Sequence, residues 1–191
     1  KTTKGVVGYD LPRVFIGSEG PLGIITRMTL RLLPLPQDIR TMTAIFDEID
    51  KATETVSEII RRSIIPRTIE FMDHTSIQCV KDHFKTGLPK KSQALLLIDV
   101  DGTADETDRE LTQLKQLCLS QGAMRVEAAK NDADAANLWK ARKAISPALF
   151  KYGPDKINED IVVPRSKIPQ MVKKIDALRM ETGLIMASFG H

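Results

Sequence analysis

The first residues that could take part in chemistry form a glycine-rich segment at positions 17–26, with glycine at positions 17, 20 and 23. Glycines at these intervals let the backbone approach a ligand closely and expose its amides to a phosphate or to the edge of a ring. The segment has neither the Gly-x-Gly-x-x-Gly spacing of a dinucleotide-binding turn nor the Gly-Lys-Ser/Thr of a P-loop. On these residues alone, a structural turn and a nucleotide-binding loop are equally open.

A second set of residues lies on a helix that we expect to begin at about position 132. Its core-facing stripe consists of Ala135, Leu138 and Trp139. Continuing this stripe reaches Arg142 and then Ser146. A buried arginine is costly unless it pairs with an anion, and its planar fork suits a carboxylate. The residues alone favour the ordinary alternatives, an arginine snorkelling near a helix end or an internal ion pair with a residue such as Glu159.

The histidines and cysteines show no metal-binding pattern. His74, His83 and His191 have no helical ligand spacing, and no Cys-x-x-Cys lies near them. We expect His74 and His83 to be surface or helix-capping residues. Cys79 and Cys118 lie far apart, each in an expected amphipathic helix. Both are therefore expected to be buried, reduced thiols of a cytoplasmic protein.

The elements that must position these residues follow from the spacing of apolar side chains. Apolar stripes at helical spacing occupy positions 52–60, 111–118 and 168–178. Pro66 closes the first, Gly122 and Gly183 stand just past the others, and Ser166 is the expected N-cap of the third. Strand-like runs occupy positions 26–33, 41–46, 68–71, 94–100, 125–128, 160–163 and 184–189.

This order of elements predicts an α+β fold, a ferredoxin-like and mostly antiparallel sheet with helices on one face. A doubly wound parallel sheet is disfavoured, because no glycine-rich phosphate turn joins a strand to a helix after position 40. The connection between positions 71 and 94 also has room only for a short helix. Residues 1–36 hold five of the eleven glycines and end in Pro34-Leu35-Pro36. We therefore expect a domain boundary near Pro36.

Composition excludes several classes of protein. The 191 residues carry 28 Lys plus Arg against 25 Asp plus Glu, and 42% are hydrophobic, as in an ordinary globular chain. No apolar run approaches the ~20 residues that a membrane span needs, and no secretory signal is visible. The basic residues are dispersed and aromatic residues are only 5%, so a nucleic-acid partner is not expected.

Five motifs, in order, resemble a known family. They are Gly-Tyr-Asp-Leu at 8–11, Phe-Ile-Gly-Ser-Glu-Gly-Pro-Leu-Gly-Ile-Ile-Thr at 15–26, Glu-Phe-Met-Asp at 70–73, Leu-Trp-Lys-Ala-Arg-Lys at 138–143 and Glu-Asp-Ile-Val-Val-Pro-Arg-Ser-Lys-Ile-Pro at 159–169. The ordered set resembles the FAD-linked 2-hydroxy-acid oxidases and dehydrogenases. This family includes the flavin subunit of glycolate oxidase, D-lactate dehydrogenase and D-2-hydroxyglutarate dehydrogenase.

The resemblance implies a domain organisation. Residues 1–36 would be the C-terminal tail of a vanillyl-alcohol-oxidase-type FAD-binding domain, and residues 37–191 most of the substrate, or cap, domain. Members of the family carry Gly-His-x-Gly-Asp-Gly-Asn-x-His near their C-terminal end, and Gly190-His191 matches its first two residues. The resemblance therefore implies an internal fragment of a longer enzyme, cut inside this motif.

It also implies roles for individual residues. The FAD-lining residues would be Gly17, Ser18, Glu19, Gly20, Gly23, Ile24 and Ile25. Pro21 stands where the family usually has threonine, which removes one backbone amide. Arg142 would bind the substrate carboxylate and Ser146 would contact the substrate, and either Lys156 or Asn158 would point at it. His191 would be both catalytic and a ligand of a divalent metal such as zinc.

The implied reaction is oxidation of a D-2-hydroxy acid (glycolate, D-lactate or D-2-hydroxyglutarate) to the 2-oxo acid, with hydride transfer to FAD. Arg142 would hold the carboxylate while the metal polarises the 2-hydroxyl. The alternative is a free-standing ferredoxin-like module that binds small acids or a protein without catalysis. The electron acceptor is not identified, a homodimer or other oxidase subunits are both open, and the enzyme could lie in the cytoplasm or peripherally at a membrane.

The 191-residue chain alone should neither retain FAD nor turn over, because the family's pyrophosphate site lies mostly outside these positions. Flavin fluorescence after reconstitution and desalting is the measurement. Stoichiometric retention of FAD by this chain would contradict the expectation.

Overall fold

The computed structural model describes residues 7–84 and 87–191 and divides the chain into two compact units, Lys1–Leu35 and Pro36–His191. The division falls beside the expected boundary at Pro36, and the assignment of the two units to two domains stays a prediction. In the described part of the first unit, α1 (Pro12–Phe15) is the one regular element. The expected strand at 26–33 does not form there, because it has no neighbouring strand to pair with.

The second unit is built around an antiparallel sheet. Among its described residues the strands are β1 (Asp38–Phe46), β2 (Thr68–Asp73), β3 (Ala94–Gly102), β4 (Arg125–Ala128) and β5 (Phe189–Gly190). Their order across the sheet is β4-β1-β3-β2-β5, and every neighbouring pair is antiparallel. The first four strands and the helices that follow β1 and β3 have the ferredoxin-like order, which confirms the expected fold class.

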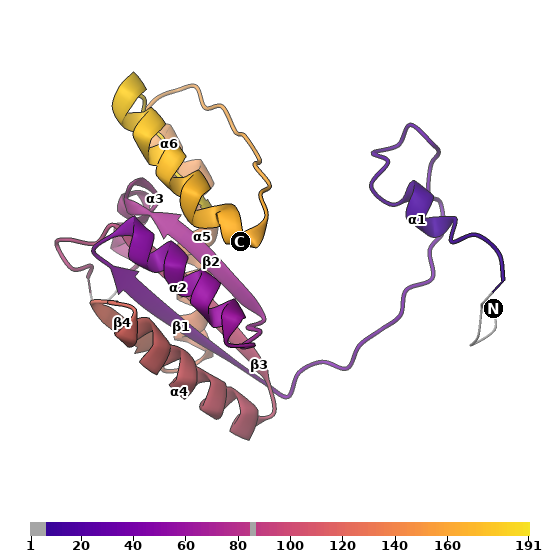
Figure 1. Ribbon diagram of the computed structural model, residues 1–191, viewed down its shortest axis with the longest axis horizontal. Coiled ribbons are helices and arrows are strands. Elements are labelled where there is room, and N and C mark those ends of the chain that lie inside the picture. The colour runs from indigo at the N-terminus through magenta and orange to yellow at the C-terminus, as the bar shows by residue number, and fades with distance from the viewer. Residues whose placement is uncertain (1–6, 85–86) are drawn as a thin grey trace. The chain divides into compact units, whose positions relative to one another are not determined.

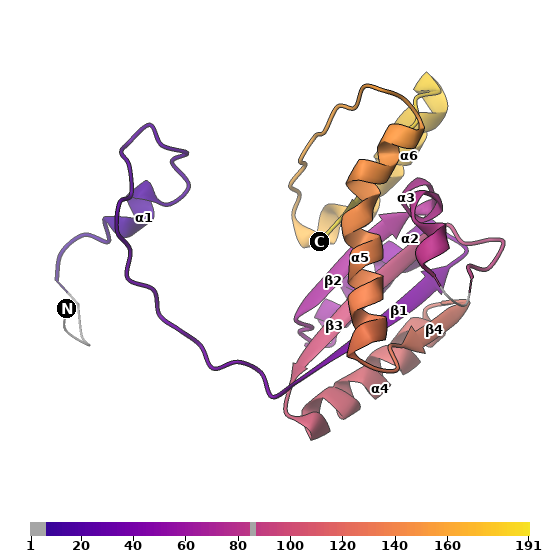
Figure 2. The same ribbon diagram turned by 180° about the vertical axis from the view of Figure 1, so that it is seen from behind.

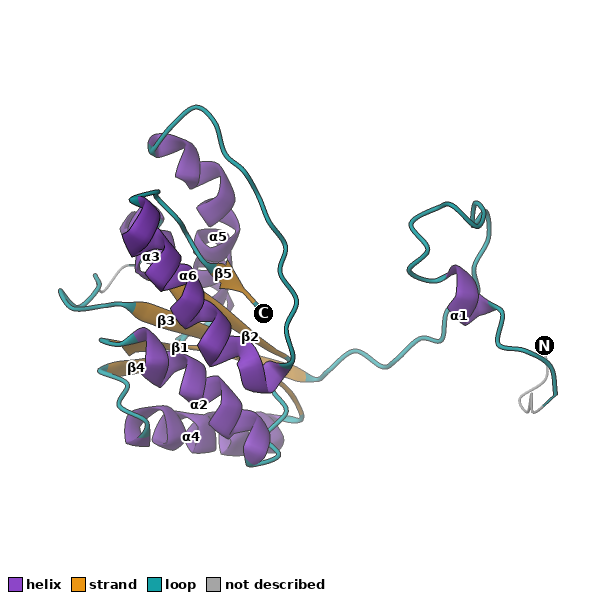
Figure 3. Cartoon of the chain, turned by 45° about the horizontal axis from the view of Figure 1, so that its top comes forward, coloured by secondary structure: helices purple, strands orange, loops and turns teal. Residues whose placement is uncertain are grey.

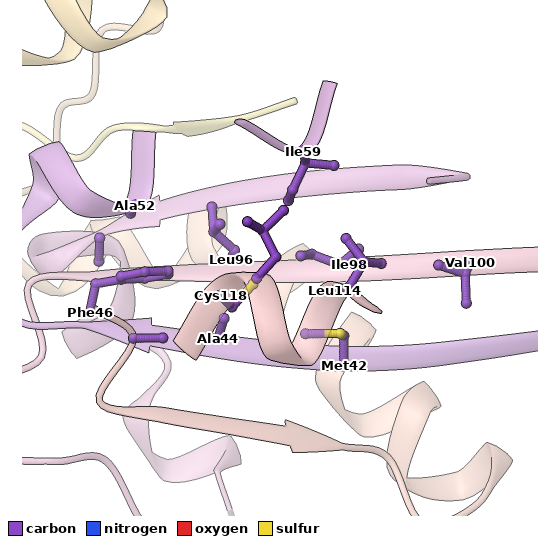
Figure 4. Close-up of a cluster of buried hydrophobic side chains, with 13 residues drawn as sticks. Met42, Ala44, Phe46, Ala52, Ile59, Leu96, Ile98, Val100, Leu114 and Cys118 are labelled. Carbon is purple, nitrogen blue, oxygen red and sulfur yellow. The ribbon is translucent and has the colours of Figure 1, made fainter. Parts of the chain in front are cut away.

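One face of the sheet carries the two helices that complete the ferredoxin-like unit, α2 (Ile49–Arg61) and α4 (Ala104–Ser120), and Figure 1 shows both in front of the strands. Their apolar stripes meet even-numbered residues of β1 and β3, and Figure 4 shows Ile59 and Leu114 directed at this layer. A capping box begins α4, in which Thr103 and Glu106 bond each other's backbone amides. The third predicted helix, α6 (Ile168–Thr182), lies alongside α2 (Figure 3).

The opposite face is covered as well, by α3 (His74–Cys79) and α5 (Asp132–Ala148) (Figure 2). The expectation of helices on one face was therefore incomplete. The reason lies in β3, where the consecutive side chains Leu95, Leu96, Leu97 and Ile98 are all buried. A run without alternation is typical of a strand that needs cover on both faces. Short 3-10 helices complete the unit at Lys81–His83, Leu149–Lys151 and Arg165–Lys167.

Three local predictions in the C-terminal part were wrong. Positions 160–163 form no strand, and of 184–189 only Phe189 belongs to one, in β5. Apolar side chains alone do not make a strand when no partner edge is available. Ser166 is not the N-cap of α6, which begins after Lys167 and has Pro169 in its first turn. With Ser166 as cap, proline would occupy the position whose amide the cap needs.

The two thiols and the C-terminal end of α6 agree with the sequence-based predictions. Cys79 and Cys118 are buried and unpaired, and burial raises the pKa of Cys118 to about 12. Gly183 ends α6 with a left-handed φ of 68°, a conformation that favours glycine. Among the described residues, no helix combines the length and apolarity that a bilayer crossing requires.

Replacement of Leu114 by alanine should lower the free energy of unfolding by about 2–5 kcal/mol, because it leaves a cavity between α4 and the sheet. Leu119→Ala on the same helix is the matched control, since that side chain is 48% exposed and should lose far less. Urea denaturation of both variants measures the difference. Equal losses would contradict the packing described for α4.

Candidate functional site

The sheet face beneath α5 changes from apolar to polar along the strands. Three rows of paired residues cross β1, β3 and β2 in turn: Ile45, Leu95 and Met72; then Thr43, Leu97 and Glu70; then Thr41, Asp99 and Thr68. The first row packs with Ala141 and Ile145 of α5 in a buried apolar cluster. The other two rows place two buried carboxylates, Glu70 and Asp99, on the same face. Buried charges of this kind require partners.

The first carboxylate organises what we call the Glu70 cluster, made of Glu70, Arg142, Phe189 and His191. Arg142 Nε donates to Glu70 Oε2 at 2.8 Å, and the two side chains are only 16% and 10% exposed. The Arg142 guanidinium carbon also lies 4.7 Å from the centre of the Phe189 ring. The other carboxylate oxygen, Oε1, is 3.4 Å from His191 Nδ1. The structure thus brings Arg142 and His191 to one carboxylate, and the internal partner of Arg142 is Glu70 rather than Glu159.

The second carboxylate, Asp99, holds the preceding turn of α5. Asp99 accepts hydrogen bonds from Thr41 Oγ1 at 2.7 Å and from Trp139 Nε1 at 3.1 Å. Burial raises the pKa of Asp99 above its ordinary value, and these two hydrogen bonds oppose the shift. Trp139 is therefore fixed to β3 one turn before Arg142, which limits how α5 can rotate over the sheet.

Two more expected substrate residues meet each other at the C-terminal end of α5. Lys156 Nζ donates to Ser146 Oγ at 2.6 Å and to the Ser146 carbonyl oxygen at 3.1 Å. The same ammonium group lies 5.3 Å from the centre of the Phe150 ring. Asn158, the other residue left open, is exposed on the chain beyond Lys156. The contacts join Lys156, but not Asn158, to the serine that follows Arg142 by one helical turn.

The position of β5, and so of Phe189 and His191, depends on Asp73. Its Oδ1 accepts from the Ser76 amide at 2.8 Å and caps α3, while its Oδ2 accepts from the Ser188 amide at 2.9 Å. The Asp73 amide in turn donates to the Ser188 carbonyl at 2.9 Å. Burial raises the pKa of Asp73, and the hydrogen bonds from the Ser76 and Ser188 amides oppose this rise. This residue therefore attaches the C-terminal strand to the edge of β2.

The expected FAD-lining residues all lie in the first unit, Lys1–Leu35. Gly17, Gly20 and Gly23 have φ angles of 84°, 99° and 156°, so side chains would be strained at each. An ideal Cβ at Gly17 or Gly20 would meet nothing within 4 Å, so the positive φ rather than lack of space favours glycine there. Pro21 occupies a turn closed by the Gly23 amide and the Gly20 carbonyl at 3.2 Å. The assignment of these residues to the lining of FAD stays a prediction.

The described residues offer too few ligands for a divalent metal. Among the described residues there is no group of three or more His, Cys, Asp and Glu side chains that could hold a metal ion. His191 has Glu70 beside it, but this carboxylate already accepts from Arg142. A stable site needs three or four ligands. The described residues therefore do not fit a metal by themselves, and the expectation that His191 is a metal ligand stays untested.

The sequence-based predictions did not single out Glu70, Asp99 or Phe189 as functional. A signal was present, because Glu70 and Asp99 are acidic residues inside strands and each has a large apolar residue two positions away, Met72 beside Glu70 and Leu97 beside Asp99. Such residues are rarely buried unless paired. What the sequence could not supply was the partner, since Glu70 and Arg142 are 72 positions apart.

Fold and site together define a ferredoxin-like α+β domain with an arginine–carboxylate cluster beneath one helix. The chain belongs to the family described as FAD linked oxidases, C-terminal domain, whose model matches residues 35–191. This result confirms the resemblance seen in the ordered motifs.

Curated relatives agree with this assignment. The chain is 39% identical over 191 residues to the glycolate oxidase subunit GlcD of Bacillus subtilis, covering 100% of the chain and 41% of that protein. Its identity to GlcD of Escherichia coli (strain K12) is 34%, covering 96% of the chain and 37% of that protein. A D-lactate dehydrogenase of Archaeoglobus fulgidus is 29% identical, with 100% and 42% covered. The chain thus spans about two fifths of these relatives.

Among solved structures, an alkyldihydroxyacetonephosphate synthase has the same fold. It superimposes with a TM-score of 0.69 at 16% sequence identity, covering 95% of this chain and 39% of that one. At this identity the likeness concerns the fold alone.

The raised pKa of Asp99 leads to a prediction about stability and pH. Because the folded-state pKa lies above the ordinary value of 3.8, the buried charge opposes folding at neutral pH, and this penalty disappears as the pH falls. The unfolding free energy of wild type, relative to Asp99→Asn, should therefore rise from pH 7 towards about pH 4. Urea denaturation at several pH values measures this difference, and a difference that is constant with pH would contradict it.

Proposed function

We propose that this chain is part of a flavoenzyme that oxidises a D-2-hydroxy acid to the 2-oxo acid and passes the hydride to FAD. Glycolate, D-lactate and D-2-hydroxyglutarate are the candidate substrates. The single observation that carries the proposal is Arg142, a nearly buried guanidinium at the polar end of a sheet face in a chain that belongs to the FAD-linked oxidases. Glycolate oxidase subunits and D-lactate dehydrogenases among the relatives support the substrate class.

Arg142 is proposed to bind the substrate carboxylate. A guanidinium offers five N–H donors in a plane, so that one edge can stay with Glu70 while others face a ligand. Ser146 and Lys156, joined by their hydrogen bond, would contact the substrate one turn further along α5. This contact supports Lys156 over Asn158 as the second polar residue, since Lys156 is already directed at the end of the site.

His191 is proposed to take the proton of the 2-hydroxyl. With Nδ1 turned towards Glu70, the other ring nitrogen, Nε2, is the one free to accept that proton. FAD, when bound, supplies the acceptor for the hydride. The loop at positions 17–25 is proposed to line it through its backbone, at Gly17, Ser18, Glu19, Gly20, Gly23, Ile24 and Ile25. The described residues do not by themselves form a metal site.

Domain roles and surroundings belong to the same proposal. Residues 1–36 would complete an FAD-binding domain of the vanillyl-alcohol-oxidase type, and residues 37–191 would form most of the substrate domain. We propose that the enzyme acts in the cytoplasm or peripherally at a membrane surface. It would act as a homodimer or with other oxidase subunits.

The test is Arg142→Lys in the full-length parent enzyme. Lysine keeps the charge but loses the planar pair of donors, so kcat/KM for the D-2-hydroxy acid should fall roughly 10- to 100-fold while the FAD content is unchanged. Arg61→Lys is the matched control, since Arg61 is 76% exposed on α2 and pairs with Glu58.

Three results would count against the proposal. The first is a wild-type parent that does not oxidise any of the three acids, and the second is an Arg142→Lys variant as active as wild type. The third is a flavin-free parent that binds carboxylates through Arg142 without turnover, which would favour a binding module instead.

A further inference from the structure

We propose that Glu70 is a positioning residue that orients Arg142 for the substrate carboxylate. The inference deepens the proposed function and rests on it. It starts from the fact that Glu70 lies on β2, in a different element from Arg142 on α5 and from His191 at the C-terminal end. Its two carboxylate oxygens face these two groups separately, Oε2 towards Arg142 and Oε1 towards His191.

Two contacts hold the Arg142 guanidinium. Nε donates to Glu70 Oε2 at 2.8 Å, and the guanidinium carbon lies over the Phe189 ring, 4.7 Å from its centre. The hydrogen bond restrains the group along one direction, and the cation–π contact holds its carbon over the ring. Together they leave the guanidinium little freedom to rotate about its last side-chain bonds.

The terminal nitrogens of Arg142 are left available by this arrangement. Within the described part of the chain, Arg142 makes its side-chain hydrogen bond through Nε. Nη1 and Nη2 are not buried atoms without a partner, so solvent or a ligand can reach them. Nη1 and Nη2 together form the pair of parallel donors that a carboxylate binds. Glu70 thus occupies the Nε edge of the guanidinium and leaves Nη1 and Nη2 for the substrate carboxylate.

Burial makes this positioning effective. The Glu70 side chain is 10% exposed and is fixed in a row with Leu97 and Thr43, so the carboxylate cannot follow a moving arginine. Its charge also offsets the cost of burying the guanidinium while no substrate is bound. A purely structural ion pair would need the same contact, so the test must separate substrate affinity from stability.

The experiment compares Glu70→Ala and Glu70→Gln in the full-length, FAD-loaded parent enzyme. Glutamine keeps an oxygen that can accept from Arg142 Nε, whereas alanine does not. We expect Glu70→Ala to raise KM for the D-2-hydroxy acid, and the inhibition constant of the matching 2-oxo acid, by about 10-fold or more. Glu70→Gln should keep both within about 3-fold of wild type. The 2-oxo acid has the carboxylate but no 2-hydroxyl, so its inhibition constant reports on Arg142 and not on proton transfer to His191.

Glu58→Ala is the matched control, because it removes similarly close carboxylate–arginine pairs, with Arg61 and Arg62 on α2, from a carboxylate that is only 13% exposed and lies outside the Glu70 cluster. It should leave KM and the inhibition constant unchanged. If Glu70→Ala does not fold, Glu70→Asp replaces it, since the shorter side chain withdraws the carboxylate from Nε, and the same rise is expected.

The outcomes separate the two proposals. An inactive wild-type parent contradicts the proposed function. If wild type is active and Arg142→Lys is impaired, but Glu70→Ala or Glu70→Asp leaves the inhibition constant unchanged, only the positioning role of Glu70 is wrong. Equal rises in Glu70→Ala and Glu70→Gln would also overturn it, because they would show that the charge rather than the orienting hydrogen bond matters.

Discussion

The Asp73 carboxylate is the constraint on which the candidate site depends. One oxygen caps the N-terminus of α3 by accepting from the Ser76 amide, and the other accepts from the Ser188 amide. A single side chain thus joins β2, a helix and the segment that leads into the C-terminal strand. This attachment pairs Met72 with Phe189 in the sheet register. Phe189 then lies against Arg142, and His191 lies near Glu70. Because β5 is only two residues long, its own ladder could not hold these groups without the Asp73 contacts.

The two ends of the sheet face under α5 contact the helix in different ways, one through apolar packing and the other through hydrogen bonds to buried carboxylates. Ile45, Leu95 and Met72 bury apolar area against the C-terminal half of the helix, which drives its docking. Glu70 and Asp99 lie beneath the preceding turns, where each buried carboxylate has donors from α5. Because unpaired buried charges are costly, these donors also select one rotation of the helix. The apolar end thus supplies stability and the polar end supplies geometry.

Local patterns predicted the ferredoxin-like part of the fold well. The stripes of α2, α4 and α6 and the runs of β1 to β4 were all visible in the sequence, because the helices carry apolar residues at helical spacing and the strands are short runs rich in apolar or β-branched residues. The second layer was not predicted, although the unbroken apolar run in β3 required it. The runs at 26–33 and 160–163 show the converse error, since residue type cannot indicate whether a partner edge exists.

The candidate site was predicted in a similarly uneven way. Arg142 was singled out through a motif that is contiguous along the chain, and Ser146 and either Lys156 or Asn158 were singled out through their positions relative to such motifs. Their surroundings come from distant positions: Glu70 lies on another strand, and Phe189 reaches Arg142 only through β5. A ligand-binding role and an internal ion pair do not exclude each other at Arg142. A guanidinium has more than one edge, so the internal pair with Glu70 can be what prepares the remaining donors for a ligand.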